Sequence, residues 1–177
     1  SETIDSLLTL DASNGDTVIV KDLNRGGTFI YDATQRAVNN GGTIFDGWVR
    51  QFNGAVNVKW FGAIDDDDGS LTTTNSKDAF TKCFEYLNSI GGGTIYLPKD
   101  KTGGYFLNGD DTTQVTTPIE IVAEEGVYLR FIYSGGITNS PFASNNLKYN
   151  RELKKIMHNF GFNTYIFQII TSMIIFS

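Results

Sequence analysis

Four consecutive aspartates, at residues 65–68, form the densest group of side chains in this sequence that could do chemistry. Clustered carboxylates bind calcium, or act as acid and base in the cleavage of a glycosidic bond. An EF-hand loop with its glycine at Gly69 would begin at Ile64, which has no oxygen ligand. It would end at Asn75, which is not the required bidentate glutamate. The EF-hand interpretation therefore fails.

Three interpretations of the acidic run remain open. The first is a calcium site of another geometry. The second is a catalytic pair, which needs two carboxylates about 5–10 Å apart across a cleft and supporting residues that the sequence does not show. The third is a solvated turn, favoured by Asp-Gly turn chemistry and by repulsion among the charges. We predict the turn, reversing the chain between a strand that ends at Trp60 and a helix.

Other reactive residue types lack partners at useful spacings. His158 has no cysteine, aspartate or second histidine near it, so it predicts neither a metal site nor a general base. Cys83 lies in an apolar helical pattern and is expected to be buried. We expect Trp60 to pack in the core, whereas Trp48 is left open between the core and stacking on a sugar ring. We predict no catalytic, cofactor-binding or metal-ligating residue, and no cofactor.

The composition indicates a globular β protein. The 177 residues are 40% hydrophobic, 13% aromatic and 19% charged, and include 19 glycines. This balance excludes a disordered chain, and the glycine and aromatic content favours a turn-rich β fold. The net charge of −6 argues against a nucleic-acid partner.

Period-two runs and glycine-rich turns predict a series of short strands. Residues 3–8 can form a short helix capped by Thr3. Residues 56–60 alternate and read as one strand. The other predicted strands lie at residues 17–20, 28–31, 43–45, 48–52, 94–98, 105–107, 118–122 and 127–133.

One amphipathic helix interrupts the strands, at residues 75–90. Asn75 or Ser76 can cap its start, and residues 91–93 are three glycines that provide a left-handed stop. Its apolar positions fall on one stripe: Ala79, Phe80, Cys83, Phe84, Leu87 and Ile90. Because the open end of a stack of β coils must be covered, such a helix is suited to act as its lid.

The last 35 residues differ from the rest. Residues 1–142 contain 18 of the 19 glycines and carry 19 acidic against 10 basic residues, whereas residues 143–177 carry one acidic and four basic residues. A helical stripe is predicted through Leu153, Ile156, Met157 and Phe160. The apolar run that follows is shorter than the roughly 20 residues of a membrane-spanning helix, so we expect no membrane partner.

The segment VNVKWFGAIDDDDGS…NSKDAFTKCFEYLNSIGGGTIYLP (residues 56–98) resembles the entry into the right-handed β-helix of the pectate-lyase-like superfamily. The preceding segment GGTFIYDATQRAVNNGGTIFDGWVRQFNGAVNVKWFGA (residues 26–63) is similar to the small β domain that precedes the β-helix in bacteriophage tailspikes and tail fibres. The resemblance covers about residues 1–135. It implies a mainly β fold with a small β-meander domain (1–55) and a capping helix with the first coils of a right-handed parallel β-helix (56–142). The change in composition adds a third region, an atypical, helical or irregular apolar tail (143–177).

The resemblance implies a virion component, made in the bacterial cytoplasm and acting outside the cell. The expected partners are two further copies in a homotrimer, other tail proteins and bacterial surface polysaccharide. Because no later coil is recognised, we expect a truncated spike protein with a structural or glycan-binding role and no catalysis of its own. One alternative is a polysaccharide lyase or hydrolase subunit active only as an oligomer, using Asp110, Asp111, Glu124 and Glu125, for which loop solvation is the simpler role. Another is a small protein that interferes with spike assembly.

Overall fold

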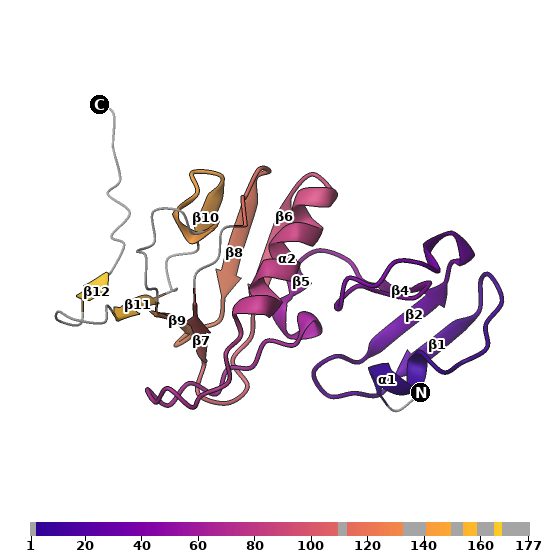
Figure 1. Cartoon of the computed structure of the whole chain (residues 1–177), viewed down its shortest axis with the longest axis horizontal. Helices are drawn as coiled ribbons and strands as arrows, with labels where there is room; N and C mark the ends of the chain where they lie inside the picture. Colours follow the sequence, from indigo (N-terminus) through magenta and orange to yellow (C-terminus); the bar gives the residue numbers. More distant parts are fainter. Residues whose placement is uncertain (1–2, 110–112, 133–140, 150–153, 159–164, 168–177) are drawn as a thin grey trace.

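The structure is a computed structural model that describes residues 3–109, 113–132, 141–149, 154–158 and 165–167. It has two parts (Figure 1): a small antiparallel sheet at the N-terminal end, and a larger body in which most strands run parallel. No helix in the described part of the chain combines the length and apolarity needed to cross a lipid bilayer.

The N-terminal part begins with a capped helical turn, as predicted. The Thr3 hydroxyl accepts a hydrogen bond from the Ser6 backbone N–H, and the Ser6 side chain bonds back to the Thr3 backbone, which starts α1 (Ile4–Leu7). Four antiparallel strands follow in the order β1-β2-β4-β3. They are β1 (Thr17–Val20), β2 (Gly27–Tyr31), β3 (Ile44–Phe45) and β4 (Trp48–Gln51), with a 3₁₀ turn η1 (Ala33–Gln35) after β2.

This small sheet has its own core, separate from that of the larger body. Ile4 and Leu7 of α1 pack with Phe29, Phe45 and Trp48, all of them at most 4% exposed. The Phe29 and Phe45 rings meet edge to face with centroids 5.9 Å apart. The strands predicted within residues 17–52 are confirmed, but the predicted meander is wrong, because β4 pairs with both β2 and β3 and lies between them.

The strand predicted at residues 56–60 is shorter than expected. β5 comprises only Val56–Asn57, and a 3₁₀ turn η2 (Val58–Phe61) replaces the rest. The Asn57 side chain accepts a hydrogen bond from the Lys59 N–H, which starts the turn, and Gly62 ends it with φ of 98°. An asparagine side chain thus competes with the strand ladder for the backbone.

The amphipathic helix is confirmed as α2 (Lys77–Ser89). The Asn75 side chain accepts from the Lys77 N–H, and residues 91–93 have φ of 91°, 111° and 145°, which only glycine adopts readily. The stripe is buried, with Phe80, Cys83 and Phe84 fully inaccessible to solvent. Only its last predicted member, Ile90, is exposed, at 55%.

After α2 the chain alternates between two sheets whose strands pair in parallel (Figure 1). Each passage along the chain therefore adds one strand to each sheet. The first sheet contains β5, β6 (Gly93–Leu97), β8 (Ile119–Ala123) and β10 (Leu147–Tyr149). The second contains β7 (Gly104–Asn108), β9 (Tyr128–Ile132), β11 (Lys154–His158) and β12 (Tyr165–Phe167), of which β12 alone pairs antiparallel.

The core of the larger body is formed by both sheets together with the α2 stripe. Ile95 of β6 lies beside Ile121 of β8 in the parallel register, and both side chains are fully buried. The Phe142 ring, in the 3₁₀ turn η3 (Pro141–Ala143), lies 5.3 Å from Phe84 and 4.9 Å from Phe131. The helix, the sheets and the loop before β10 thus share one apolar interior.

The helical stripe predicted in the tail is wrong where the structure describes it. Residues 154–158 form β11, which pairs with β9 over five residues, from Lys154↔Tyr128 to His158↔Ile132. The unpaired edge of β9 offers a ladder of backbone hydrogen bonds, and such pairing outweighs helical periodicity. Leu153 and Phe160, the two ends of the stripe, lie outside the described residues.

Candidate functional site

The four aspartates do not form the solvated turn that the sequence predicts. Asp65 is 0% and Asp67 is 2% exposed, whereas Asp68 is exposed and Asp66 is half-buried. The alternation arises because this segment runs extended along the edge of β7, where Asp66 bridges Gly104 and the Asp67 N–H donates to the Gly104 carbonyl at 3.0 Å. Every second side chain therefore points inward.

Asp65 is held by one ammonium group and a row of backbone amides. Its Oδ1 accepts from Lys59 Nζ at 2.6 Å, and its Oδ2 accepts from the N–H groups of Asp100, Lys101 and Gly103 at 2.8, 2.8 and 3.2 Å. Burial alone would raise the pKa of Asp65, but the Lys59 ammonium and the amides outweigh it and lower that pKa below the usual value. The carboxylate thereby fixes the loop between β6 and β7.

Asp67 forms a bidentate ion pair with Arg130 of β9. Arg130 donates to the two carboxylate oxygens at 2.7 and 2.5 Å, and also to the Ser70 carbonyl at 2.7 Å. The guanidinium lies 3.9 Å from the centroid of the Phe106 ring. Burial opposes ionisation of Asp67, yet hydrogen bonds from Arg130 and from the Gly69 N–H hold its pKa below the usual value. This pair ties the acidic segment to the second sheet.

Asp66 and Asp68 form their hydrogen bonds within their own loop. Asp66 Oδ2 accepts from the Thr74 hydroxyl at 2.7 Å, and Asp68 Oδ1 accepts from the Ser70 N–H at 2.8 Å and from the Thr73 hydroxyl at 2.8 Å. These bonds lower the pKa of Asp68 to about 2. Among the described residues, no three acidic, histidine or cysteine side chains converge as metal ligands.

The acids considered for catalysis are not brought together. Glu124 accepts from the Tyr96 hydroxyl and, at 2.8 Å, from the Lys99 N–H, so both of its oxygens are engaged. These two hydrogen bonds lower the pKa of Glu124. The hydrogen bond between Tyr96 and Glu124 also raises the pKa of Tyr96 to about 12. Glu125 is exposed beside it, while Asp110 and Asp111 lie outside the described residues.

The other residues considered for chemistry or sugar binding lie in the core, at the junction of the two parts or in a strand. Cys83 is fully buried, and burial raises the pKa of its thiol. Trp48 is 4% exposed and meets Tyr31 edge to face at 5.3 Å, so it is not available to stack on a sugar. Trp60 is half-buried at the junction of the two parts. His158 lies in β11.

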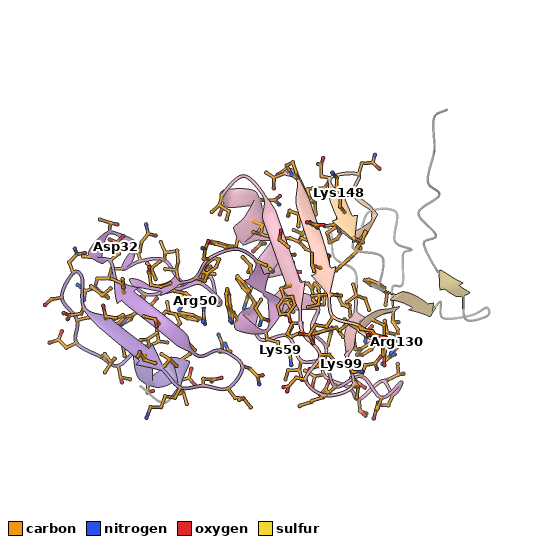
Figure 2. The ribbon with its side chains drawn as sticks, turned by 180° about the vertical axis from the view of Figure 1, so that it is seen from behind. Asp32, Arg50, Lys59, Lys99, Arg130 and Lys148 are labelled. Atoms are coloured by element: carbon orange, nitrogen blue, oxygen red, sulfur yellow. The ribbon has the colours of Figure 1, made fainter. Side chains whose placement is uncertain are left out.

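Arg50 occupies the neck between the small sheet and the larger body (Figure 2). It is 4% exposed, and its guanidinium lies 4.6 Å from the Phe29 ring and 4.5 Å from the Trp60 ring, one from each part. It donates to three carbonyls, those of Gly42, Gly26 and Arg25, at 3.0, 2.5 and 2.6 Å. Burial, with a smaller contribution from the Arg25 charge, lowers the pKa of Arg50 to about 10.

Arg25 and Gly42 complete the neck. Arg25 donates to the Trp60 carbonyl at 3.1 Å and to the Gly41 carbonyl at 2.8 Å, so it also links both parts. A Cβ atom at Gly42 would lie 2.5 Å from the Phe61 ring, which shows how closely the backbone approaches η2. Directed hydrogen bonds and close packing therefore set the angle between the small sheet and the larger body.

A cleft of about 540 Å³ opens beside this neck, between the small sheet and α2. Its lining mixes amide, charged and apolar side chains. One wall is formed by Gln35, Val38, Asn39, Asn40, Gly41 and Ile44, and the other by Lys82, Glu85, Tyr86, Ser89 and Ile90. The sequence pattern gave no sign of it, because the two walls are about 45 residues apart.

Residues 1–53 match the family described as phage tail protein small four-stranded beta-sheet domain. No curated protein matches the chain. Among solved structures, the tailspike protein of Acinetobacter phage vB_ApiP_P1 has a TM-score of 0.60 at 20% identity over 90% of this chain and 29% of its own. The tailspike of Acinetobacter baumannii phage AM24 has a TM-score of 0.56 at 21% identity over 87% and 28%.

A third neighbour, the gp42 tailspike of Acinetobacter phage vb_AbaP_AS12, has a TM-score of 0.57 at 22% identity over 76% of this chain and 23% of its own. The chain thus spans less than a third of the length of each of these tailspikes. At these identities the likeness concerns the fold. Residues 1–53 are thus similar to a phage tail protein domain, and the fold of the chain is similar to that of part of these tailspikes.

Proposed function

We propose that the chain forms the base of a phage tailspike and has a structural role in the virion. In this proposal residues 1–55 are the small β domain, residues 56–142 the capping helix and first coils of a right-handed parallel β-helix, and residues 143–177 an atypical tail, of which β10 and β11 extend the two sheets. The observation that carries the proposal is the neck, where Arg50 is sandwiched between Phe29 and Trp60. A joint built from directed hydrogen bonds can transmit orientation from a tail-attached domain to a rod.

The β-helix itself is supported by the alternation of the chain between two sheets with parallel pairing. The buried α2 stripe, which packs on the same core, supports the lid role of that helix. A solenoid needs such a cap because its end coil cannot bury its own apolar face.

We further propose that the protein assembles as a homotrimer, contacts other virion tail proteins and acts outside the cell on bacteria whose surface polysaccharide it binds. Its synthesis would take place in the host cytoplasm. The oxygens of Asp65, Asp67 and Glu124 are engaged in internal hydrogen bonds, so these three acids give catalysis no support.

Sedimentation equilibrium of the purified chain tests the assembly. The chain mass is 19.5 kDa, and a species of three times that mass is expected, whereas a monomer at all concentrations would contradict the trimer. A panel of capsular polysaccharides, assayed both for retention by the immobilised chain and for new reducing ends or unsaturated products, separates binding from cleavage. Retention without product is the expected result, and product formation would favour the depolymerase alternative.

A further inference from the structure

One wall of the cleft is an exposed edge of the small sheet. Asn39 bridges Phe45 in antiparallel fashion, and the flanking hydrogen bonds run from Asn40 N–H to the Ile44 carbonyl (3.1 Å) and from Asp46 N–H to the Val38 carbonyl (2.9 Å). This is the non-hydrogen-bonded kind of pair, in which the N–H and C=O of the central residue point away from the partner strand.

The backbone N–H and C=O of Asn39 therefore face outward along the sheet edge. Within the described residues neither group has a hydrogen-bond partner. An unpaired donor and acceptor on a sheet edge are a template for a further strand. The Asn39 side chain accepts from the Gly41 N–H at 3.1 Å, an Asx turn that bends the chain directly after this bridge residue.

The opposite wall is the outer face of α2. Lys82 and Glu85 lie one helical turn apart and are both exposed, and no ion pair joins them within the described residues. Tyr86 is half-buried, with its ring 6.2 Å from that of Phe61. Ile90, 55% exposed, and Val38 on the sheet side, 38% exposed, add apolar surface.

We propose that this cleft binds an extended peptide segment of a partner protein, which adds as a strand along Asn39 and lies against α2. A groove between a sheet edge and a helix is a recurring site for strand addition, in which main-chain hydrogen bonds supply affinity and alternate side chains supply specificity. This inference goes beyond the proposed role of the chain in the spike, because it assigns a peptide-recognition site to the neck.

The side chains around the groove specify what the segment carries. An apolar residue of the segment packs between Val38 and Ile90. An acidic residue pairs with Lys82, and a basic residue pairs with Glu85.

Both walls are fixed before the segment arrives. Arg25 holds the Gly41 carbonyl at the end of the sheet edge and the Trp60 carbonyl of η2, on which α2 packs. The groove therefore does not have to close on its ligand, and most of the conformational entropy lost on binding is lost by the peptide.

Selection of a random 12-residue peptide library on the immobilised chain provides the probes. Binding of the enriched peptides is then compared among the unaltered chain, Ser89→Trp, which fills the groove, and Asp78→Trp, which lies on the same helix outside it. We expect affinity to fall at least roughly tenfold for Ser89→Trp and to be unchanged for Asp78→Trp. We also expect bound peptide to protect the Asn39 amide from hydrogen exchange, and Glu85→Lys to shift the selected peptides from basic to acidic residues.

Several outcomes would overturn the proposal. They are a library without enrichment, peptides that bind Ser89→Trp as well as the unaltered chain, and an Asn39 amide that exchanges at the same rate with peptide bound. A self-associated species that Ser89→Trp, and not Asp78→Trp, converts to a smaller one would show that a second copy fills the groove. Circular dichroism of both tryptophan variants establishes that they are folded, and Ile90→Lys, at an exposed position, provides a second blocking variant. Because the trimer is tested by mass alone, its failure is distinct from failure of this site.

Discussion

The Arg50 guanidinium lies 4.5 Å from the centroid of the Trp60 ring, which belongs to the other part of the chain. Its three backbone bonds all go to carbonyls of residues before the larger body: Arg25, Gly26 and Gly42. The cation thus belongs to the small sheet by its hydrogen bonds and reaches the larger body by stacking.

Arg50→Ala is expected to lower the free energy of unfolding by about 2–4 kcal/mol, because three carbonyls lose a charged donor and two rings lose their shared contact. Arg50→Lys should retain only part of the lost free energy of unfolding, because a lysine ammonium cannot donate to all three carbonyls in the planar arrangement of a guanidinium. Urea denaturation measures both variants, with the exposed Arg36→Ala as the control. Equal midpoints for Arg50→Ala and Arg36→Ala would refute the role of the neck.

Asp67→Asn should destabilise the protein by about 3–5 kcal/mol, because it leaves the Arg130 charge buried without its counter-ion. Asp68→Asn should change stability by no more than about 0.5 kcal/mol, since Asp68 is exposed. Thermal or urea unfolding monitored by circular dichroism distinguishes the two. In the double variant Asp67→Asn with Arg130→Met, part of the loss should be recovered, and a strictly additive loss would contradict the buried-pair interpretation.

Stability should fall as the solution is acidified below about pH 4. The pKa values of Asp65 and Asp67 are lower in the folded chain than the usual value of about 3.9. The unfolded chain therefore takes up protons first, so the stabilisation is complete above that pH and is lost as the pH falls through the folded values. Urea midpoints measured from pH 7 to pH 2.5 test this. In Asp65→Asn the urea midpoint should fall less steeply with pH below about pH 4. An unchanged slope would show that Asp65 does not contribute to the acid sensitivity.

Cys83 should react with a thiol reagent only when the chain unfolds. Its side chain lies on the buried face of α2, and burial raises the pKa of the thiol, so little thiolate is present at neutral pH. Labelling followed by mass spectrometry should give a rate that rises with urea in parallel with global unfolding. Rapid labelling in the absence of denaturant would mean that α2 detaches from the core.

Local patterns in the sequence were sufficient to predict both helices and most strands. The α2 stripe and its three terminal glycines act within one segment, so periodicity and backbone chemistry determine the outcome there. The Thr3 cap of α1 is equally local.

The site depended on contacts that no local pattern reveals. Asp67 and Arg130 are 63 residues apart, and Asp65 is buried only because Lys59 and the amides of residues 100–103 meet it there. The one local signal was spacing: Asp65 and Asp67 lie two apart, as inward residues of an extended segment do. Likewise, residues 154–158 form a strand because they pair with the edge of β9. The helical spacing of apolar residues within the tail could not reveal that edge.

The register of the parallel sheets has a consequence for how such a protein can grow. Strand partners are separated by 26 residues from Gly93 to Ile119, by 24 from Gly104 to Tyr128 and by 26 from Tyr128 to Lys154. Because each such interval adds one strand spacing of about 4.8 Å to each sheet, gene duplication or exchange of a whole interval would widen both sheets while leaving the register of the neighbouring strands intact. Gains or losses of a few residues are accommodated only where the chain crosses between sheets.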